Sequence, residues 1–359
     1  MDDLPAIPRK GRGAIGNPTG RFEAAQREAF DDGWGGLEEE PGPLVTTFVD
    51  DATRSIIARN DSPDISFDRS INPYRGCEHG CIYCFARPGH SYLGLSAGLD
   101  FETRIFVKEK APELLAAELR KKNYSCQPIA IGTNTDPYQP VERKLKIMRG
   151  ILEVLRDFEH PVGIVTKSAL IQRDIDILAP MAEKRLAKVA VSLTTLDRKL
   201  ARIMEPRAAS PERRLDTIGA LSAAGIPTAV MTAPMIPALN DAELEQLLEA
   251  AVARGASSAG YVLVRLPHEV KTLFREWLDT HWPDKADHVM SLLRQAHGGK
   301  AYEAEWGKRM SGSGPYAEML RLRFQKACER LGISRQNVWK LDTTRFRPPP
   351  QPGDQLKLF

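Results

Sequence analysis

Three cysteines within eight residues are the feature of this chain that most constrains its structure. They are Cys77, Cys81 and Cys84, in the run C-x3-C-x2-C. Three thiolates this close can bind three irons of a four-iron cluster and leave the fourth iron without a protein ligand, whereas ordinary electron-transfer clusters use four cysteines. An iron with an open position can bind a second molecule. The sequence therefore predicts a loop built around a reactive iron–sulfur cluster.

The residues around the cysteines extend this signal well beyond three positions. The stretch from Asn72 to His90 reads N-P-Y-R-G-C-E-H-G-C-I-Y-C-F-A-R-P-G-H. Here the chain resembles the radical S-adenosylmethionine (SAM) superfamily and, within it, the bacterial proteins related to spore photoproduct lyase. Phe85 and Gly89 stand where Tyr and Thr are expected in close relatives, and these departures leave the cluster prediction unchanged.

The resemblance implies a 4Fe–4S cluster on the three cysteines, with SAM bound to the open iron through its amino and carboxylate groups. It also implies reductive cleavage of SAM to methionine and a 5′-deoxyadenosyl radical, with an electron donor such as flavodoxin or ferredoxin. Tyr83 occupies the aromatic position before the third cysteine, which in the family lies against the adenine.

A zinc knuckle is the competing interpretation of the cysteines. Structural zinc takes four ligands from Cys and His, and His79 or His90 would supply the fourth. No second C-x2-C pair is present in the sequence, so zinc is the weaker hypothesis. The two other cysteines, Cys126 and Cys328, stand alone and are interpreted as packing residues.

Composition sets the scale of the fold. The 359 residues are 42% hydrophobic, enough for a barrel-type domain of about 200–250 residues with additions. The net charge of +3 is close to neutral, so it does not indicate a particular kind of binding partner. The longest uncharged stretch, 218–240, is interrupted by Gly and Pro, so no membrane span is expected. An odd number of cysteines argues against a disulfide framework, and the lack of a recognisable secretory leader together with a chemistry that needs reduced thiols favours the cytoplasm.

Strand-like and helix-like segments alternate from about residue 65 to 300. A first strand leads into the cysteine loop, and further strands are predicted at 128–133, 161–166, 188–193, 228–233 and 260–265. Helices are predicted at 111–121, 143–158, 174–184, 211–224 and 241–254, with Ser210 and Asn240 as helix caps. This alternation predicts an α/β fold with parallel strands. The resemblance sharpens it to an incomplete (βα)6 TIM-type barrel.

Four segments are expected along the chain. Residues 1–44 are rich in Gly, Pro and charge and form an extended N-terminal segment. Residues 65–300 form the partial barrel, and 301–347 add a basic helical extension. Residues 348–359 form a flexible tail with a terminal Q-L-K-L-F peptide.

Candidate cofactor residues follow the strands, because chemistry in such barrels gathers at the carboxyl ends of the strands. Thr133, Asn134 and Asp136 follow the second strand, Lys167 follows the third, and Ser192 ends the fourth. The resemblance assigns the first group to the SAM amino group, Lys167 to the carboxylate and Ser192 to the ribose. The alternatives are a turn held by its own side chains, a solvated lysine and a helix-capping hydroxyl.

Later loops carry further polar candidates for cofactor or substrate contact. They are Arg173, Asp174, Glu205, Arg207 and Arg265. Arg265 follows the sixth strand and is expected to place one cation at the mouth of the barrel.

Two C-terminal features bear on partners. Residues 321–347 carry eight cations against two carboxylates, with Trp339 and Phe346 interleaved, which suits phosphates and bases or a solvated helix face. The chain ends in Gln355, Leu356, Lys357, Leu358 and Phe359. This peptide resembles the one with which bacterial replication and repair proteins bind the sliding clamp, the alternative being a tail that folds back.

The sequence thus supports three functional hypotheses. The first is a radical SAM enzyme acting on DNA, as a lyase that reverses a lesion. The second is a radical SAM enzyme acting on a small molecule or a protein. The third is a non-enzymatic iron–sulfur or zinc protein that binds nucleic acid.

Overall fold

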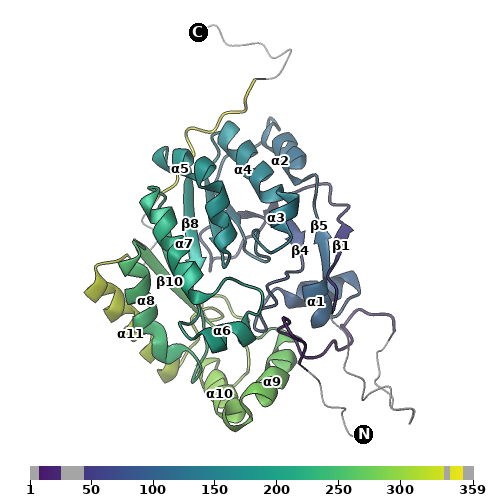
Figure 1. The fold of residues 1–359 in the computed structure, drawn as a ribbon, viewed down its shortest axis with the longest axis vertical. Helices are drawn as coiled ribbons and strands as arrows, with labels where there is room; N and C mark the ends of the chain where they lie inside the picture. The colour runs from purple at the N-terminus through teal and green to yellow at the C-terminus, as the bar shows by residue number, and fades with distance from the viewer. Residues whose placement is uncertain (1–7, 26–43, 335–339, 351–359) are drawn as a thin grey trace.

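The computed structural model describes residues 8–25, 44–334 and 340–350, and its centre is a seven-stranded sheet. The strand order is β10-β9-β8-β7-β6-β3-β2 (Figure 1). The strands are β2 (Ala58–Arg59), β3 (Arg69–Ile71), β6 (Ile129–Ile131), β7 (Val162–Thr166), β8 (Ala187–Ser192), β9 (Thr228–Met235) and β10 (Ser258–Leu263). Neighbours from β3 to β10 run parallel, and β2 is antiparallel to β3. The predicted α/β fold with a parallel sheet is confirmed.

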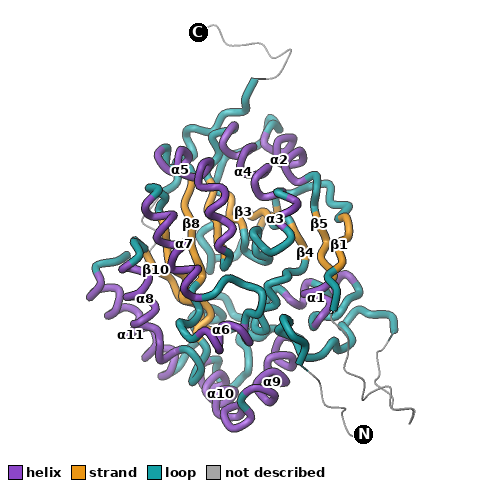
Figure 2. Tube along the Cα trace, viewed as in Figure 1, coloured by secondary structure: helices purple, strands orange, loops and turns teal. Residues whose placement is uncertain are grey.

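Helices surround the strands, as Figure 2 shows. They are α1 (Leu99–Thr103), α2 (Ala111–Leu119), α3 (Glu142–Leu145), α4 (Ile147–Asp157), α5 (Ile175–Glu183), α6 (Arg198–Met204), α7 (Pro211–Ala223), α8 (Leu244–Ala253), α9 (Val270–His281), α10 (Pro283–Ala296) and α11 (Pro315–Leu331). Since a crossover helix follows each of several parallel strands, the carboxyl ends of the strands meet at one edge of the sheet.

The single helix predicted at 143–158 is two helices in the structure. Lys146 has a left-handed backbone with φ of 55°, which ends α3 and begins α4. The buried Glu142 carboxylate accepts a hydrogen bond from the Met148 N–H at 3.1 Å, which satisfies a donor at the start of α4. A contact between a side chain and a backbone N–H six residues later does not change the spacing of apolar residues, so helical periodicity does not predict it.

The two predicted helix caps have different outcomes. The Ser210 hydroxyl accepts from the Arg213 N–H at 3.4 Å and caps α7, as predicted. The prediction for Asn240 is wrong. Its side chain is buried, accepts from the Ile236 N–H at 2.6 Å, and donates to the Thr194 carbonyl at 2.7 Å. Asn240 therefore joins the loops after β8 and β9 instead of capping a helix.

A second, three-stranded sheet lies beside the cysteines and was not predicted. Its strands are β1 (Thr47–Asp50), β5 (Arg104–Val107) and β4 (Tyr74–Arg75), in the order β1-β5-β4. Ile105, in β5, is fully buried. Strands of two to four residues are too short for a clear alternation of polar and apolar side chains, so the pattern does not reveal them.

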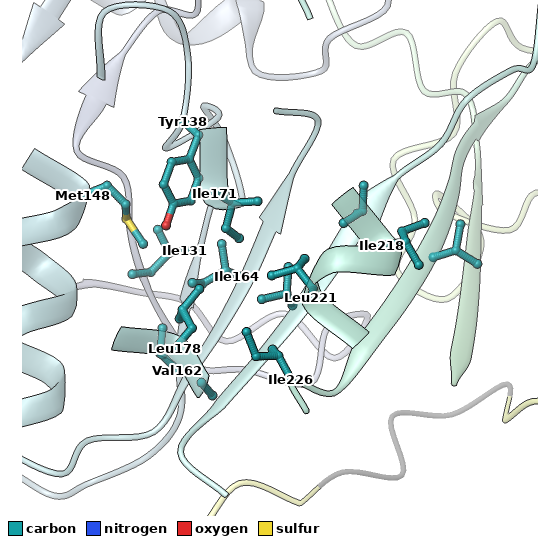
Figure 3. Close-up of a cluster of buried hydrophobic side chains, with 14 of the residues drawn as sticks. Ile131, Tyr138, Met148, Val162, Ile164, Ile171, Leu178, Ile218, Leu221 and Ile226 are labelled. Atoms are coloured by element: carbon teal, nitrogen blue, oxygen red, sulfur yellow. The ribbon is translucent and has the colours of Figure 1, made fainter. Parts of the chain in front are cut away.

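Apolar side chains fill the space between the sheet and its helices. Figure 3 shows Val162 and Ile164 of β7 packed near Leu178 of α5 and Ile171, all of them buried. A second cluster, which includes Ile82, Phe274 and Trp277, lies between the cysteine loop and α9. The cysteine loop therefore rests on a core of its own.

The predicted segment boundaries stay predictions. Within the described part of 1–44, Ala14 and Ile15 are buried, and α11 of the C-terminal extension packs on α8 and β10. Trp339 and the terminal peptide 355–359 lie outside the described residues. In the part of the chain that the structure describes, no helix has the length and apolar character needed to cross a bilayer.

Candidate active site

The three cysteines share one loop between β4 and the 3-10 turn η1 (Arg87–Gly89). Cys77 and Cys81 are buried, Cys84 is partly exposed, and all three are free thiols. The Cys84 N–H donates to the Cys81 carbonyl at 3.1 Å, and the Cys77 N–H donates to the Phe101 carbonyl at 2.9 Å. The loop is thus closed on itself and anchored to α1.

A buried ion pair organises this loop. The Arg87 guanidinium donates to the carbonyls of Gly80 at 3.1 Å and Cys81 at 2.9 Å, and its Nη2 lies 2.5 Å from Glu102 Oε1. Both charged side chains are fully buried. Buried charges are stable only when their hydrogen bonds are satisfied, so these contacts fix the path of the chain between the first two cysteines.

The thiols of this loop suit metal binding. Burial raises the pKa of Cys77 and of Cys81, and nearby carboxylates of Asp136 and Glu205 act in the same direction. A thiolate at either position therefore needs a cation beside it, which an iron atom supplies. Three soft sulfur donors in one loop, two of them buried, are the donor set that an iron–sulfur cluster takes.

Both histidines offered as a fourth zinc ligand have protein partners. His90 Nε2 lies 2.9 Å from the Arg104 carbonyl oxygen, and burial lowers the His90 pKa to about 4. His79 Nδ1 lies 3.4 Å from Asp136 Oδ2. These contacts give both rings a structural role and count against the zinc interpretation.

Asp136 connects the cysteine loop to the ends of β6 and β7. Its carboxylate accepts from the Thr166 hydroxyl at 2.7 Å and from the Lys167 N–H at 2.7 Å, and it faces His79. Burial would raise the Asp136 pKa, but His79 and these hydrogen bonds outweigh burial and lower it to about 2. Asp136 is therefore ionised and already engaged by protein donors.

Tyr83 joins the cysteine loop to a second buried ion pair. Its hydroxyl donates to the Glu205 carboxylate, which pairs with Arg214. The Thr194 hydroxyl donates to the same carboxylate at 2.7 Å, and Arg214 also donates to the Ser192 carbonyl at 3.1 Å. Burial raises the Glu205 pKa, and Arg214 opposes this shift. The network holds the ends of β8 and the cysteine loop together.

Two predicted SAM residues lie at this network. Lys167 Nζ lies 5.9 Å from the centroid of the Tyr83 ring. Ser192 is buried, and within the described residues neither the Lys167 ammonium nor the Ser192 hydroxyl has an ion-pair or hydrogen-bond partner. A cation and a hydroxyl near an aromatic ring suit a ligand that carries a carboxylate, hydroxyls and a planar base.

Thr133 and Asn134 are held by Asn72, the residue after β3. Asn72 Oδ1 accepts from the Asn134 N–H at 3.0 Å, and Asn72 Nδ2 donates to the Thr133 hydroxyl at 3.4 Å. The exits of β3 and β6 are thereby joined. Asn72 is absent from the predicted site, although it heads the motif around the cysteines.

Arg265 and Phe85 form a cation–aromatic contact next to Cys84. The guanidinium carbon of Arg265 lies 4.2 Å from the Phe85 ring centroid. Burial lowers the Arg265 pKa, and among the described residues no carboxylate forms a salt bridge with it. Phe85 is 41% exposed, so part of the ring remains open to a ligand.

The basic segment 321–347 is mostly neutralised by the protein's own carboxylates. Arg323 pairs with Glu245 at 2.6 Å and Arg330 pairs with Glu249 at 2.5 Å. The Phe346 ring packs on the rings of Tyr124 and His160, with centroids 5.3 and 5.4 Å away. These contacts favour the structural interpretation of this segment.

Residues 71–251 match the family model of the Radical SAM superfamily. This stretch is about half of the chain and includes the cysteine loop and the ends of β6, β7, β8 and β9. The chain belongs to the radical SAM superfamily. It is therefore an enzyme that uses a 4Fe–4S cluster and SAM. The predicted family is confirmed, and the non-enzymatic alternative is not supported.

Relatives of this radical SAM enzyme occur in bacteria and archaea. An uncharacterised protein of Mycobacterium tuberculosis is 38% identical over 233 residues, which are 64% of this chain and 68% of that protein. An uncharacterised protein of Methanocaldococcus jannaschii is 31% identical over 175 residues, 48% of this chain and 62% of that protein.

Solved structures of spore photoproduct lyase share the fold of this radical SAM enzyme. The lyase complexed with a dinucleoside spore photoproduct superposes with a TM-score of 0.56 at 14% identity, over 79% of each chain. A variant with bound AdoMet and the same ligand has a TM-score of 0.50 at 13% identity, over 79% of this chain and 78% of the lyase. At such identities the likeness concerns the fold.

The buried charges that organise the enzyme's site were mostly missed by the sequence analysis. Glu102 and Arg214 lie inside helices, where a charged residue normally faces solvent. Arg173 and Asp174, expected to extend the cofactor network, instead form a salt bridge at 2.8 Å and pair with the Glu142 and Arg149 side chains. No local pattern distinguishes such residues from surface charges.

Proposed function

We propose that this radical SAM enzyme acts on a nucleic acid, as a lyase that reverses a lesion in DNA. The observation that carries the proposal is the Arg265–Phe85 contact beside Cys84. A guanidinium that forms no salt bridge with a described carboxylate suits a phosphate, and a partly exposed aromatic ring suits a base. The shared fold with a lyase that binds a dinucleoside photoproduct supports the same class of substrate.

We assign the cluster to Cys77, Cys81 and Cys84. When bound, the cluster supplies the electron that cleaves SAM to methionine and a 5′-deoxyadenosyl radical. An external reductant, such as flavodoxin or ferredoxin, must provide that electron. The Arg87–Glu102 pair keeps the loop in the form that presents the three thiols.

We assign Lys167, Ser192 and Tyr83 to SAM. The Lys167 ammonium binds the carboxylate of SAM, because it has no protein carboxylate among the described residues. The Ser192 hydroxyl binds the ribose, and the Tyr83 ring lies against the adenine. The short separation of Lys167 and Tyr83 supports a common ligand for both.

The loop after β6 is assigned to the amino group of SAM. Asp136 contributes its negative charge, since its pKa of about 2 keeps it ionised. Its oxygens already accept protein hydrogen bonds, so direct contacts fall to Thr133 and Asn134. In the finer fold that we propose, β3 and β6–β10 with their helices form an incomplete (βα)6 barrel with this site at its mouth.

The test is a turnover assay with anaerobically reconstituted enzyme, SAM and a chemical reductant. Formation of 5′-deoxyadenosine is compared without DNA, with intact DNA and with ultraviolet-damaged DNA. We expect damaged DNA to raise the rate, and oligonucleotide binding to weaken with salt. We expect Arg265→Gln to weaken oligonucleotide binding about tenfold, the cost of one charge-assisted contact.

A matched control is Arg321→Gln, which removes an exposed arginine paired with Glu318. It should bind oligonucleotides as the wild type does. If neither intact nor damaged DNA changes turnover or binds while 5′-deoxyadenosine still forms, the proposal fails and a small molecule or a protein becomes the expected substrate. An Arg265→Gln enzyme with unchanged oligonucleotide affinity would remove the observation on which the proposal rests.

A further inference from the structure

An N-terminal segment crosses the cysteine loop far from its own place in the sequence. Residues 12–22, here called the strap, run between α1 and α9 in Figure 1. From the sequence, residues 1–44 are expected to form an extended segment rich in Gly and Pro. The structure instead places Ala14 and Ile15 in the apolar cluster under the cysteine loop.

One end of the strap lies directly on the cysteine loop. A Cβ atom on Gly13 would stand 1.8 Å from the carbonyl oxygen of Gly80, which lies between Cys77 and Cys81. That separation is far below any real contact, so only glycine fits at position 13. The two backbones touch where the loop turns toward its second cysteine.

Glu102 connects the strap to the ion pair that organises the loop. Its carboxylate accepts from the Gly13 N–H at 3.0 Å and the Ala14 N–H at 2.8 Å, and it pairs with Arg87. Arg12 donates to the Glu102 carbonyl at 3.0 Å. The buried Glu102 carboxylate therefore accepts hydrogen bonds from the strap and also pairs with Arg87. Arg87 in turn donates to the carbonyls of the cysteine loop.

The other end of the strap reaches the exit of the last strand. Asn17 and Asp100 exchange two hydrogen bonds, each 3.0 Å long, and Arg21 Nε lies 2.5 Å from Glu269 Oε1. Glu269 follows β10, whereas the cysteine loop follows β3, and these strands lie at opposite sides of the parallel part of the sheet. The strap thus links the two sides of the sheet that do not pair.

We propose that the strap holds the cysteine loop in its ligating form and shields the bound cluster from solvent. Gly13 and Glu102 are the positioning residues, because they act on the cysteines through Gly80 and Arg87. The role is independent of the substrate. Undocking of the strap frees the Gly80 region and opens the cluster to oxygen.

The test uses full-length Gly13→Ala with Gly16→Ala as the matched control. A Cβ on Gly16 meets its nearest neighbour at 3.6 Å, an ordinary contact, so this variant keeps the strap docked. Trypsin cleavage at Arg12 and Arg21 of the cluster-free protein reports docking. Loss of cluster absorbance in air reports shielding, and the electron paramagnetic resonance spectrum of the reduced cluster reports its ligation.

We expect Gly13→Ala to be cut by trypsin and to lose its cluster in air about tenfold faster than the wild type, as local opening requires. Its resonance spectrum should broaden, and Gly16→Ala should match the wild type in all three measurements. A Gly13→Ala protein that is cut faster yet keeps a wild-type spectrum and decay rate overturns the proposal, as does wild-type resistance to trypsin.

Arg12→Ala provides a second route if Gly13→Ala does not fold. This variant removes hydrogen bonds to the Glu102 carbonyl, the Leu44 carbonyl and the Thr46 hydroxyl without adding an atom to the interface. Circular dichroism establishes that the variant is folded. Trypsin cleavage of this variant is followed at Arg21, because Arg12 is no longer a cleavage site. Cleavage at Arg21 and loss of the cluster should both be faster than in the wild type, and unchanged values for both would contradict the proposed role of the strap.

Discussion

The Tyr83 hydroxyl donates to the carboxylate of Glu205, a residue 122 positions later in the chain. Glu205 pairs in turn with the buried Arg214. A residue of the cysteine loop is thereby tied to an ion pair at the end of β8. Because both charges are buried, the pair contributes little net stability, but loss of one partner is costly.

Removal of one partner of this pair should destabilise the protein strongly. Arg214→Met leaves the Glu205 carboxylate buried without its counter-charge, and we expect a loss of about 3–5 kcal/mol in the free energy of unfolding. Urea denaturation of the cluster-free protein measures it. Arg254→Met, which breaks an exposed pair with Asp216, should cost less than about 1 kcal/mol. Equal losses would show that burial of the first pair has no energetic consequence.

Each of the three loop cysteines should be required for the cluster. Replacement of Cys77, Cys81 or Cys84 by Ala leaves only two thiolates, so we expect loss of the cluster absorbance and of SAM cleavage. Cys126→Ala should keep both, because Cys126 precedes β6 at the amino end of the strands. Iron analysis and 5′-deoxyadenosine formation measure the outcome, and a loop variant that retains both would refute the assignment.

Lys167→Ala and Ser192→Ala should weaken SAM binding. Loss of a charge-assisted contact costs about 1–3 kcal/mol, which corresponds to a rise in Kd of about 5-fold to 150-fold, with the larger effect for Lys167. Equilibrium binding to the reconstituted protein measures Kd. The control is Lys144→Ala, on the exposed side of α3, which should leave the Kd for SAM unchanged. An unchanged Kd in both Lys167→Ala and Ser192→Ala would mean that SAM binds elsewhere.

Protonation of His160 should lower the free energy of unfolding in mildly acidic solution. Burial lowers the His160 pKa from 6.5 to about 4, so its neutral form is favoured in the folded state. Stability from this group is fully present above about pH 6.5 and is lost as pH falls toward 4, by about 3 kcal/mol. Unfolding free energies measured across this range should decline less in His160→Gln. The exposed His288→Gln should follow the wild-type decline.

The C-terminal peptide should bind the bacterial sliding clamp. The sequence Gln355, Leu356, Lys357, Leu358 and Phe359 carries two leucines and an aromatic residue that suit a hydrophobic groove. We expect deletion of residues 355–359 to abolish capture by immobilised clamp while SAM cleavage is retained. A Lys357→Ala variant should still bind, and capture of the deletion variant at the wild-type level would exclude this peptide as the contact.

Short-range patterns were sufficient for the parallel strands of the large sheet, the helices that connect most of them, and the position of the cysteine loop. In β7 and β8 fully buried side chains alternate with partly buried ones, and the cysteine spacing predicts a ligand set within eight residues. Ser210 caps α7 through a residue three positions away. Each of these features depends on neighbours in the sequence, which is why periodicity and spacing reveal it.

Contacts between distant segments were decided by the tertiary structure alone. Asn is a residue type that often caps helices, yet the side-chain amide of Asn240 is buried and bonds the loops after β8 and β9. The backbones of Gly13 and Gly80 touch, and the Gly13 N–H donates to Glu102, only because the folded chain brings these distant segments together. The sequence by itself determined the chemistry of the cluster and the parallel sheet, since both follow from local residue types. The fold decided which buried charges and backbone contacts hold that cluster's loop, because those partners meet only in the packed molecule.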